Sequence, residues 1–343
     1  VPMVDVGSKG ADEGKGGRYL FLPPNYDDKH GTAAELEAQG YIIVPDMDGH
    51  DASYSFRPTL LNGATHADAG EHAKGIKVYS LKEAVEGDIE PTEYLDATEL
   101  AYDCLPYYNM TFIEDINDVV QNNPVREKDR AIYSTLQSIG IKKGEEFNPT
   151  PIQKKAALEG LELAYAYMQK KFTTEGETVA PLWVKDGEKL SEWSFWNFGE
   201  QANMGFPFED GEEILVDKRA ASYFYVTFLP TKLGGATYYL TGLRDSDGNL
   251  LNGKDTYKLN VPADVPAKDF WSAIVYNMET KNFNRGVERV GASTKDLDRM
   301  VKNADGSVDI YYAPNLDEVP KGLEANWVTT ESATNANEWF FLF

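Results

Sequence analysis

The sequence predicts an α+β protein that is mainly β, with two antiparallel β-sandwich or jelly-roll-like lobes bridged by a helical segment. Short apolar segments separated by turn residues occupy both ends of the chain, whereas the hydrophobic period becomes helical between residues 91 and 172. Aromatic residues form 12% of the chain, led by 20 Tyr and 16 Phe, and flat rings pack well on a pleated sheet. The later strands lack long crossover helices between them, which favours antiparallel pairing.

We expect three parts along the chain. Residues 1–89 are interpreted as the C-terminal part of a first β lobe truncated at its N-terminus, residues 90–175 as a helical linker, and residues 176–343 as a second β lobe truncated at its C-terminus. The chain begins at Val1 rather than Met and stops within the apolar run 339–343, so we interpret it as a processed or trimmed piece. Its 343 residues exceed the roughly 250–300 at which a single hydrophobic core stops growing.

The first part contains four expected strands, at residues 18–22, 41–44, 53–61 and 76–79. The glycines between positions 14 and 17 and the pair Pro23-Pro24 stand at strand ends, where they disturb a ladder least. Four strands do not close a lobe comfortably, so we expect the missing N-terminal portion to supply the rest.

Three helices are expected in the linker. Thr111 and Glu114 have the spacing of a capping box at the start of the first helix, and Gly140 ends the second because glycine tolerates positive φ. Thr150 can cap the third helix, and Pro151 suits its first turn. The apolar stripe of the third helix is interpreted as core packing rather than a cofactor site, and it comprises Leu158, Leu161, Tyr165, Met168 and Phe172.

Strands resume in the last part of the chain. They are expected at residues 223–228, 237–243, 257–261, 270–278, 308–312 and 339–343. Turns rich in Asp, Asn and Gly separate them, at residues 245–249 and 303–307.

Several short segments together resemble a known family. They are residues 14–26, 40–44, 76–81, 139–147, 270–272 with Tyr276, 304–307 and 326–327. In order and spacing they resemble the bacterial family built from two domains of unknown function, 1254 and 1214, with the first over roughly residues 1–81 and the second over roughly residues 190–343. The resemblance implies jelly-roll-like lobes bridged by helices, a periplasmic or secreted location, and a homo-oligomer with a trimer favoured. It implies no activity, and family members usually extend beyond both ends of this chain.

The charge of the chain limits its partners. The formal net charge is −23 and the pI is about 4.6, so the chain repels phosphate backbones and anionic lipid headgroups, and we expect no nucleic acid partner. No run of 18 or more apolar residues is present, so we expect no membrane insertion. Cys104 is the single cysteine, so no intramolecular disulfide can form.

Residues 46–51 form the candidate metal site. Asp46, Asp48 and Asp51 surround a glycine, and alternating oxygen ligands around a glycine turn suit a hard cation such as calcium. An EF-hand also requires a carboxylate at the twelfth loop position, where this sequence has Arg57. The alternative is a solvated turn, because Asp, Asn and Gly favour turns for backbone reasons. We therefore expect no cofactor, with a calcium ion as the open alternative.

A candidate ligand contact follows this turn. Tyr54 and Arg57 lie on the expected strand 53–61, where an arginine can clamp a ligand carboxylate with two hydrogen bonds. The alternative is that Arg57 pairs with one of the 56 acidic residues of the protein itself.

An aromatic set provides the main candidate ligand site. Trp193 and Trp196 lie near the boundary between the linker and the second lobe, where a cleft is natural. Trp271 lies within an expected strand, a position that also fits core packing. Asn326 stands beside Trp327, and its amide can orient a ligand. Flat rings offer contact area at little entropic cost, which suits sugars and other flat apolar faces.

These observations favour a non-enzymatic, exported structural or binding protein that recognises a glycan, a peptide or a small molecule at an aromatic cleft. No Gly-x-Ser-x-Gly elbow, His-Glu-x-x-His helix, P-loop or dinucleotide glycine fingerprint is present. The alternative is a hydrolase that uses a carboxylate pair or a divalent cation. The sequence leaves open whether the chain is an enzyme.

Overall fold

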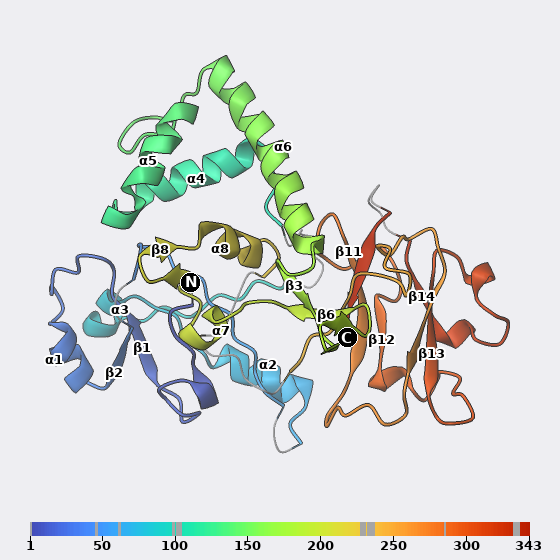
Figure 1. Ribbon diagram of the computed structural model, residues 1–343. Coiled ribbons are helices and arrows are strands. Elements are labelled where there is room, and N and C mark those ends of the chain that lie inside the picture. Colours follow the sequence, from blue (N-terminus) through green and yellow to red (C-terminus); the bar gives the residue numbers. More distant parts are fainter. Residues whose placement is uncertain are drawn as a thin grey trace.

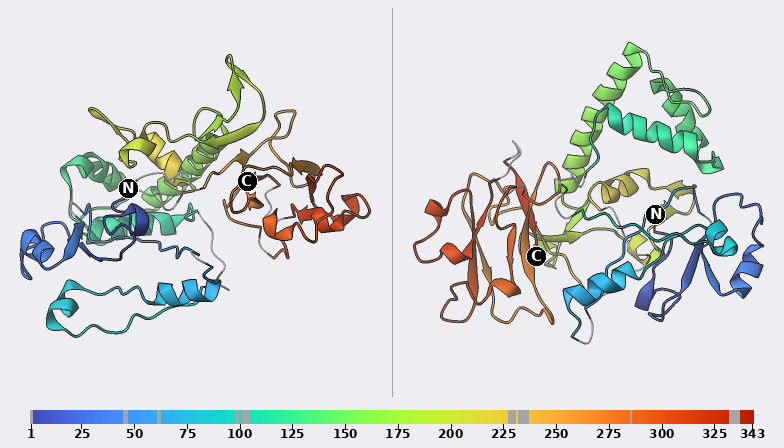
Figure 2. Two further views of the ribbon diagram at one scale, coloured as in Figure 1. Left: turned by 90° about the horizontal axis from the view of Figure 1, so that it is seen from below. Right: turned by 180° about the vertical axis from the view of Figure 1, so that it is seen from behind.

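The computed structural model describes residues 2–44, 47–60, 63–97, 100, 105–226, 231, 237–284, 286–331 and 337–343 (Figure 1). Helices are combined with several antiparallel sheets, which confirms the α+β class. Residues 2–97 belong to an N-terminal part and residues 105–173 to a helical arm. A C-terminal β lobe follows them along the chain. The arm projects away from the other two parts (Figures 1 and 2). The domain boundaries expected after residues 89 and 175 stay predictions.

The α-helices of the described chain are α1 (Ala33–Ala38), α2 (His66–Lys74), α3 (Leu81–Glu86), α4 (Met110–Asn122), α5 (Arg130–Leu136), α6 (Pro151–Thr173), α7 (Gln201–Met204) and α8 (Val216–Tyr223). Short 3₁₀ helices span Gly7–Lys9, Glu127–Asp129, Gln137–Ile139, Thr294–Asp296, Leu316–Glu318 and Glu324–Asn326. The strands of the first 240 residues are β1 (Arg18–Phe21), β2 (Tyr41–Val44), β3 (Val179–Pro181), β4 (Val184–Lys185), β5 (Glu188–Lys189), β6 (Trp193–Trp196), β7 (Glu209–Asp210) and β8 (Glu213–Ile214). The remaining strands are β9 (Thr241–Gly242), β10 (Tyr257–Val261), β11 (Ser272–Asn277), β12 (Gly291–Ser293), β13 (Val308–Ala313), β14 (Trp327–Thr329) and β15 (Trp339–Leu342).

The N-terminal part forms two of its four expected strands. β1 and β2 pair in parallel, with Arg18 opposite Tyr41, so the prediction of antiparallel pairing is wrong for them. The chain returns to the same end of the pair through α1, which lies between the two strands in sequence.

The other two expected strands of this part are not formed over their described residues, and two unexpected helices lie beside them in the sequence. Residues 53–60 and 76–79 contain no strand, and Leu61 lies outside the described residues. α2 begins at a capping box formed by Thr65 with Asp68. α3 begins at another, formed by Ser80 with Glu83. Because a capping box satisfies two N–H groups that a helix start otherwise leaves unpaired, these local bonds favour helix.

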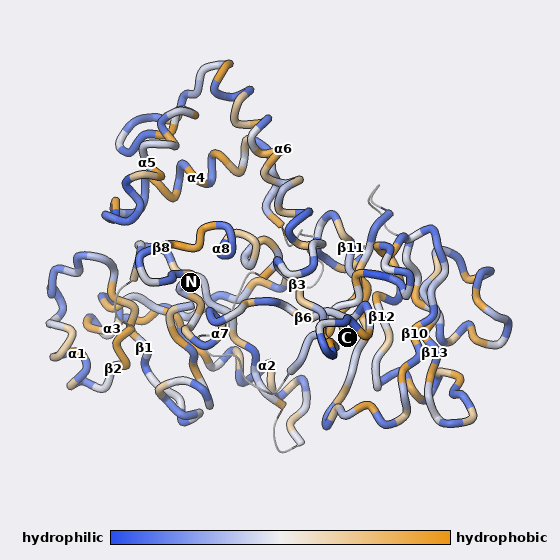
Figure 3. Tube along the Cα trace, in the orientation of Figure 1, coloured by the Kyte–Doolittle hydropathy of each residue, from blue (hydrophilic) through white to orange (hydrophobic). Residues whose placement is uncertain are grey.

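The three helices expected in the linker are present as α4, α5 and α6. Thr150 and Gln153 form a capping box at the start of α6, and Pro151 occupies its first turn. The N-cap of α4 is Asn109 rather than Thr111. Hydrophobic and hydrophilic residues alternate along α4 and α6 (Figure 3). The buried side chains of the arm form a core of their own, comprising Ile113, Val120, Ile141, Ala157 and Leu161.

The C-terminal lobe contains two main sheets. One has six strands in the order β12-β11-β15-β9-β6-β3, and all its neighbours are antiparallel. The other has three strands in the order β10-β13-β14, of which β13 and β14 are parallel. The strand expected at 223–228 is not formed over its described residues: α8 ends at Tyr223, residues 224–226 are not strand, and residues 227–228 lie outside the described chain. The strand expected at 237–243 shortens to β9.

β15 is apolar throughout because both faces of the six-stranded sheet are covered. Trp339 and Phe341 pack in a cluster with Ile310 of the three-stranded sheet, whereas Phe340 packs against Phe172 of α6. Successive side chains of a strand point to opposite faces, so an unbroken aromatic run requires a cover on each side. The C-terminal end of α6 is therefore part of the cover. Among the described residues, no helix has both the length and the apolar character to cross a bilayer.

Candidate functional site

A small pocket lies at the junction of the arm and the C-terminal lobe. Its volume is about 110 Å³, and α8 lies beside the end of α6 that forms one wall (Figure 1). We call it the junction pocket. Its walls comprise Lys171, Gly176, Glu177, Thr178, Asn197, Phe198, Gly199, Phe208, Asp217, Lys218, Ala221 and Ser222. They come from the end of α6, the segment leading into β3, the turn after β6, the Phe208 loop and α8.

Charged side chains of both signs line this pocket. The Nζ of Lys171 lies 2.9 Å from Glu177 Oε2, and this hydrogen bond raises the pKa of Lys171 above its usual range. The hydroxyl of Tyr167, one turn earlier on α6, donates to Asp217 Oδ2 over 2.7 Å. Lys218 has no hydrogen-bond or ion-pair partner in the described part of the chain. The pocket therefore holds one neutralised pair and a separate lysine.

An uncharged polar group of the pocket is unpaired. Thr178 is only 6% exposed, and its Oγ1 is buried without a hydrogen-bond partner among the described residues. Leaving a buried hydroxyl unpaired costs about 1–3 kcal/mol, so such groups are rare in stable proteins. The neighbouring Asn197 is anchored by its backbone N–H, which donates to Thr178 O over 2.8 Å. A ligand in the pocket can supply the partner that Thr178 lacks.

The backbone beneath the pocket is strained. Phe206 and Phe208 have φ of 61° and 54°, a left-handed conformation that costs a non-glycine residue about 1–3 kcal/mol. The buried side chain of Gln201 holds this loop, because its Oε1 accepts from Phe208 N over 2.6 Å and its Nε2 donates to Glu209 O over 3.2 Å. Strain of this kind persists where the surroundings over-determine it and is concentrated at functional sites.

Residues 236–343 match the family model described as "Protein of unknown function (DUF1214)". The match confirms the second half of the family resemblance over that segment, and the domain 1254 half stays a prediction. All residues that line the junction pocket precede the matched segment.

One solved structure similar to the chain is the crystal structure of the VPA0106 protein from Vibrio parahaemolyticus. The two share 16% sequence identity with a TM-score of 0.44, and the alignment covers 100% of this chain and 78% of that one. No curated protein matches the chain significantly.

Trp193 and Trp196 lie on opposite faces of β6, close to the pocket in sequence but outside its walls. The ring of Trp193 lies 5.3 Å from that of Phe341, within the cluster shared by the two sheets. The ring of Trp196 lies 5.6 Å from Phe172 and 4.2 Å from Tyr225, in the cluster beneath α6. A spacing of three residues along a strand explains the opposite faces.

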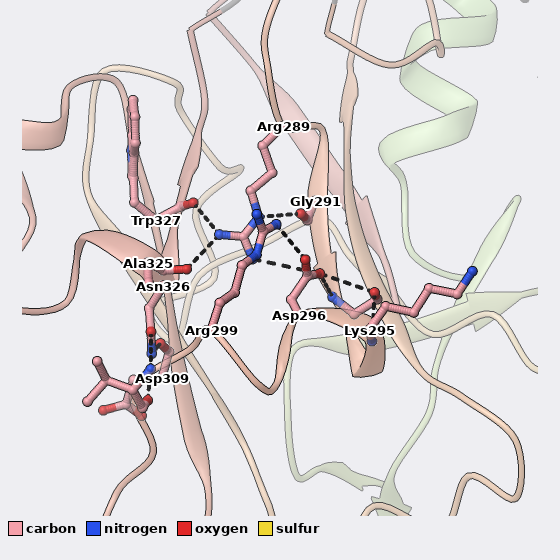
Figure 4. A network of polar contacts seen from close by, with 11 residues as sticks. Arg289, Gly291, Lys295, Asp296, Arg299, Asp309, Ala325, Asn326 and Trp327 are labelled. Atoms are coloured by element: carbon pink, nitrogen blue, oxygen red, sulfur yellow. Dashed lines mark hydrogen bonds and ion pairs between the residues drawn. The ribbon is translucent and has the colours of Figure 1, made fainter.

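Three candidates of the DUF1214-matching segment make contacts within the protein. Trp271 is 8% exposed, and its ring stacks on Phe343 at 5.6 Å. Asn326 is fully buried, and its amide accepts from Val301 N and donates to Val301 O and Asp309 O over 2.8–2.9 Å (Figure 4). Trp327 Nε1 donates to the carbonyl of Ala313.

A partly buried arginine beside Asn326 has no counterpart in the predictions. Arg289 donates to the carbonyls of Ala325, Trp327 and Gly291 over 2.8–2.9 Å, and it lies 3.8 Å from Asp296 (Figure 4). Burial lowers the pKa of Arg289. The guanidinium links its own segment to residues 325–327, which lie 36 to 38 positions further along the chain, and no local sequence pattern indicates this contact.

The candidates of the N-terminal part are exposed. Tyr54 is 56% exposed and contacts Phe56, with the ring centroids 5.2 Å apart. Arg57 lies in the same strand-free segment and has no ion pair within the described chain. Both residues stay predictions as ligand contacts.

The turn proposed for calcium docks on the end of α4. Asp48 pairs with Arg126 at 2.5 Å and with Lys128 at 3.6 Å, and Asp51 accepts from Asn123 Nδ2 over 3.2 Å. Asp46 lies outside the described residues. Among the residues that are described, no three His, Cys, Asp or Glu side chains gather in a way that could hold a metal ion.

A second hollow lies on the three-stranded sheet. It is larger, at about 490 Å³, but open to solvent, and its polar walls are already bonded to one another. Asn260 Nδ2 donates to Asp309 Oδ1 over 2.7 Å, and the hydroxyl of Ser307 donates to Asp305 Oδ1 over the same distance. We therefore regard the junction pocket, with its unpaired groups, as the candidate site.

Proposed function

We propose that this chain is a non-enzymatic binding protein that holds a small polar molecule in the junction pocket. The observation that carries the proposal is at Thr178, a residue of the pocket wall whose buried hydroxyl lacks a partner in the described chain, in a pocket with charges of both signs. A bound polar ligand supplies that hydrogen bond and offsets the cost of burying the hydroxyl. The strain at Phe208 is consistent with a loop held in place for binding.

The pocket favours binding over catalysis. Its lining residues include no His or Cys. Its hydroxyl at Thr178 has no hydrogen-bonded base among the described residues, which a nucleophile requires. The metal-dependent hydrolase has less support, because Asp48 is neutralised by two cations and Asp51 bonds to an amide.

A ligand screen by thermal shift tests the proposal. We expect one or more members of a panel of amino acids, small carboxylates, sugars and short peptides to raise the Tm of the wild-type protein. Thr178→Val should abolish or weaken that shift while leaving the unliganded protein at least as stable, because valine removes the unpaired hydroxyl and keeps the shape. Lys268→Met, at an exposed residue away from the pocket, is the matched control. If every compound fails, or if the shift survives both Thr178→Val and Lys218→Met, the proposal is wrong.

We also propose that the protein forms a homo-oligomer and is exported from the cytoplasm. The accessible surface of 22253 Å² is well above the roughly 14,000 Å² expected for a compact monomer of 38.3 kDa. Apolar side chains on α6 contribute to this surface, with Ile152 82% and Leu163 73% exposed. Both observations support a homo-oligomer, for which the family resemblance favours a trimer in the periplasm or outside the cell. Light scattering that gives the mass of a monomer at micromolar concentration would contradict it.

The architecture proposed for the C-terminal lobe is a sandwich. Its support is the cluster in which Val261 and Ile310 of the three-stranded sheet pack with Val275 and Phe341 of the six-stranded sheet. Two sheets that share an inner face in this way fit a sandwich or jelly-roll lobe.

A further inference from the structure

We infer that the junction pocket, taken as the ligand site proposed above, selects a small zwitterion, and that its ligand class is an α-amino acid with a short apolar side chain. Two cations and two anions line the pocket, so their formal charges cancel. The selection follows from which of these charges are already paired.

Lys171 and Glu177 neutralise each other, since Nζ and Oε2 are 2.9 Å apart. Asp217 is different: its Oδ2 accepts the hydrogen bond from Tyr167, and its Oδ1 has no partner in the described chain. Lys218, the next residue, likewise has no partner among the residues described. The first turn of α8 therefore offers one available anion and one available cation to the pocket.

This arrangement discriminates against ligands with a single charge. A simple carboxylate that approaches Lys218 also meets Asp217 and Glu177, and a simple amine that approaches Asp217 also meets Lys218 and Lys171. A ligand with an ammonium group and a carboxylate pairs each of them with the opposite sign through charge-assisted hydrogen bonds, which are about twice as strong as neutral ones.

The uncharged walls define the rest of the ligand. Phe198 and Phe208 offer apolar rings, which suit an aliphatic side chain. The Thr178 hydroxyl needs a partner, which a second carboxylate oxygen can provide. The volume of about 110 Å³ restricts the ligand to a compact molecule such as alanine or valine.

Titration calorimetry with three related compounds tests the inference. The probes are L-valine, N-acetyl-L-valine, which lacks the ammonium group, and L-valinamide, which lacks the carboxylate. Because a hydrogen bond to a charged group contributes about 1.5–3 kcal/mol, we expect each modified compound to bind about 10- to 100-fold more weakly than valine.

Two variants assign the charges. Asp217→Asn should weaken the binding of valine but not that of N-acetylvaline, which has no ammonium group to pair. Lys218→Met should weaken the binding of valine but not that of valinamide, which has no carboxylate. The exposed Lys268→Met variant is the control and should bind valine as the wild type does. Equal Kd values for valine and its two modified forms would overturn the zwitterion. In that case, a different polar compound whose binding depends on Thr178 leaves the proposed function intact. If valine and its two modified forms do not bind, and no compound of the broad screen binds either, then the zwitterion inference and the proposed function are both wrong.

Discussion

The ammonium nitrogen of Lys281 lies 4.3 Å from the centroid of the Phe172 ring, so a cation of the C-terminal lobe rests on an aromatic side chain of α6. The same nitrogen donates to Gln169 Oε1 and to Met278 O. Tyr165 adds a further bond from α6, because its hydroxyl donates to the carbonyl of Glu279 over 2.9 Å. These contacts connect the arm to the turn after β11. Lys281 is only 3% exposed, so these contacts must offset nearly the whole free-energy cost of burying its charge.

Stability should rise with pH above neutrality because of Lys281. Burial lowers the pKa of this lysine from 10.5 to about 7, and the nearby carboxylates of Glu338 and Glu279 oppose the shift. Between pH 7 and 10.5 the unfolded chain therefore binds more protons than the folded one. The free energy of unfolding should increase across this window by up to about 1.4 kcal/mol per pH unit. Below pH 7 the lysine is protonated in both states, and its contribution to the slope disappears.

Urea unfolding of Lys281→Met at intervals from pH 7 to 9.5 measures this effect. The variant should lose most of the slope, whereas the exposed Lys268→Met should keep it. Burial raises the pKa of Tyr225 and of Tyr312. The free energy of unfolding therefore falls again at a pH where tyrosines ionise in the unfolded chain, and for this reason the range ends at pH 9.5. A Lys281→Met protein with the wild-type slope would show that the lysine is not the source.

Phe172→Ala should destabilise the protein strongly. The ring is fully buried and contacts Trp196, Tyr225 and Phe340 with centroid distances of 5.0–5.6 Å. Loss of a buried phenylalanine typically costs about 3–5 kcal/mol, measured here as a lower denaturation midpoint in urea. Glu162→Ala on the same helix is the control, because this glutamate is exposed and its loss should cost about 0.5 kcal/mol or less. Similar costs for the two variants would argue against α6 as a cover of the sheet.

Two glycines should respond to alanine in opposite directions. Gly242 pairs with Phe341 across the sheet, and a Cβ added there would lie 2.1 Å from an atom of that ring. Gly242→Ala should therefore cost about 1–3 kcal/mol through overpacking. Gly160 lies within α6 and has no atom within 4 Å of the added Cβ, so Gly160→Ala should stabilise by about 0.5–1 kcal/mol. Thermal unfolding of the two variants beside the wild type provides the comparison, and a Tm change of the same sign in both would refute this packing.

Asn326→Ala should destabilise the C-terminal lobe. The substitution leaves the partly buried backbone groups of Val301 and Asp309 without their amide partner, at a total cost of about 1–3 kcal/mol. Asn303→Ala is the matched control, because the Asn303 amide lies at the open hollow and donates to the hydroxyl of Ser307. Denaturant melts followed by near-UV circular dichroism distinguish them. An Asn326→Ala protein of wild-type stability that loses a ligand would instead support the ligand role expected from the sequence.

The structure forms some elements where the sequence predicts them because their signals are local. Thr150, Gln153 and Pro151 act within the first turn of α6. β10, β11 and β15 lie within predicted strands, and β13 extends one residue beyond its predicted strand. The acidic composition and the single cysteine limit the partners and exclude an internal disulfide without reference to the fold. Other local signals were missed: capping boxes at Thr65 and Ser80 start helices in a part of the chain that is interpreted as a β lobe.

Only the tertiary structure decides how these elements meet. The parallel pairing of β1 with β2, the opposite faces of Trp193 and Trp196, and the left-handed backbone at Phe208 all depend on partners distant in sequence or on an unusual φ. The junction pocket is the clearest case, because Tyr167 and Asp217 meet across 50 residues. Hydrogen bonds within four residues can be predicted from a sequence pattern, whereas a site formed by the packing of α6, α8 and β6 exists only after their apolar faces have been buried together.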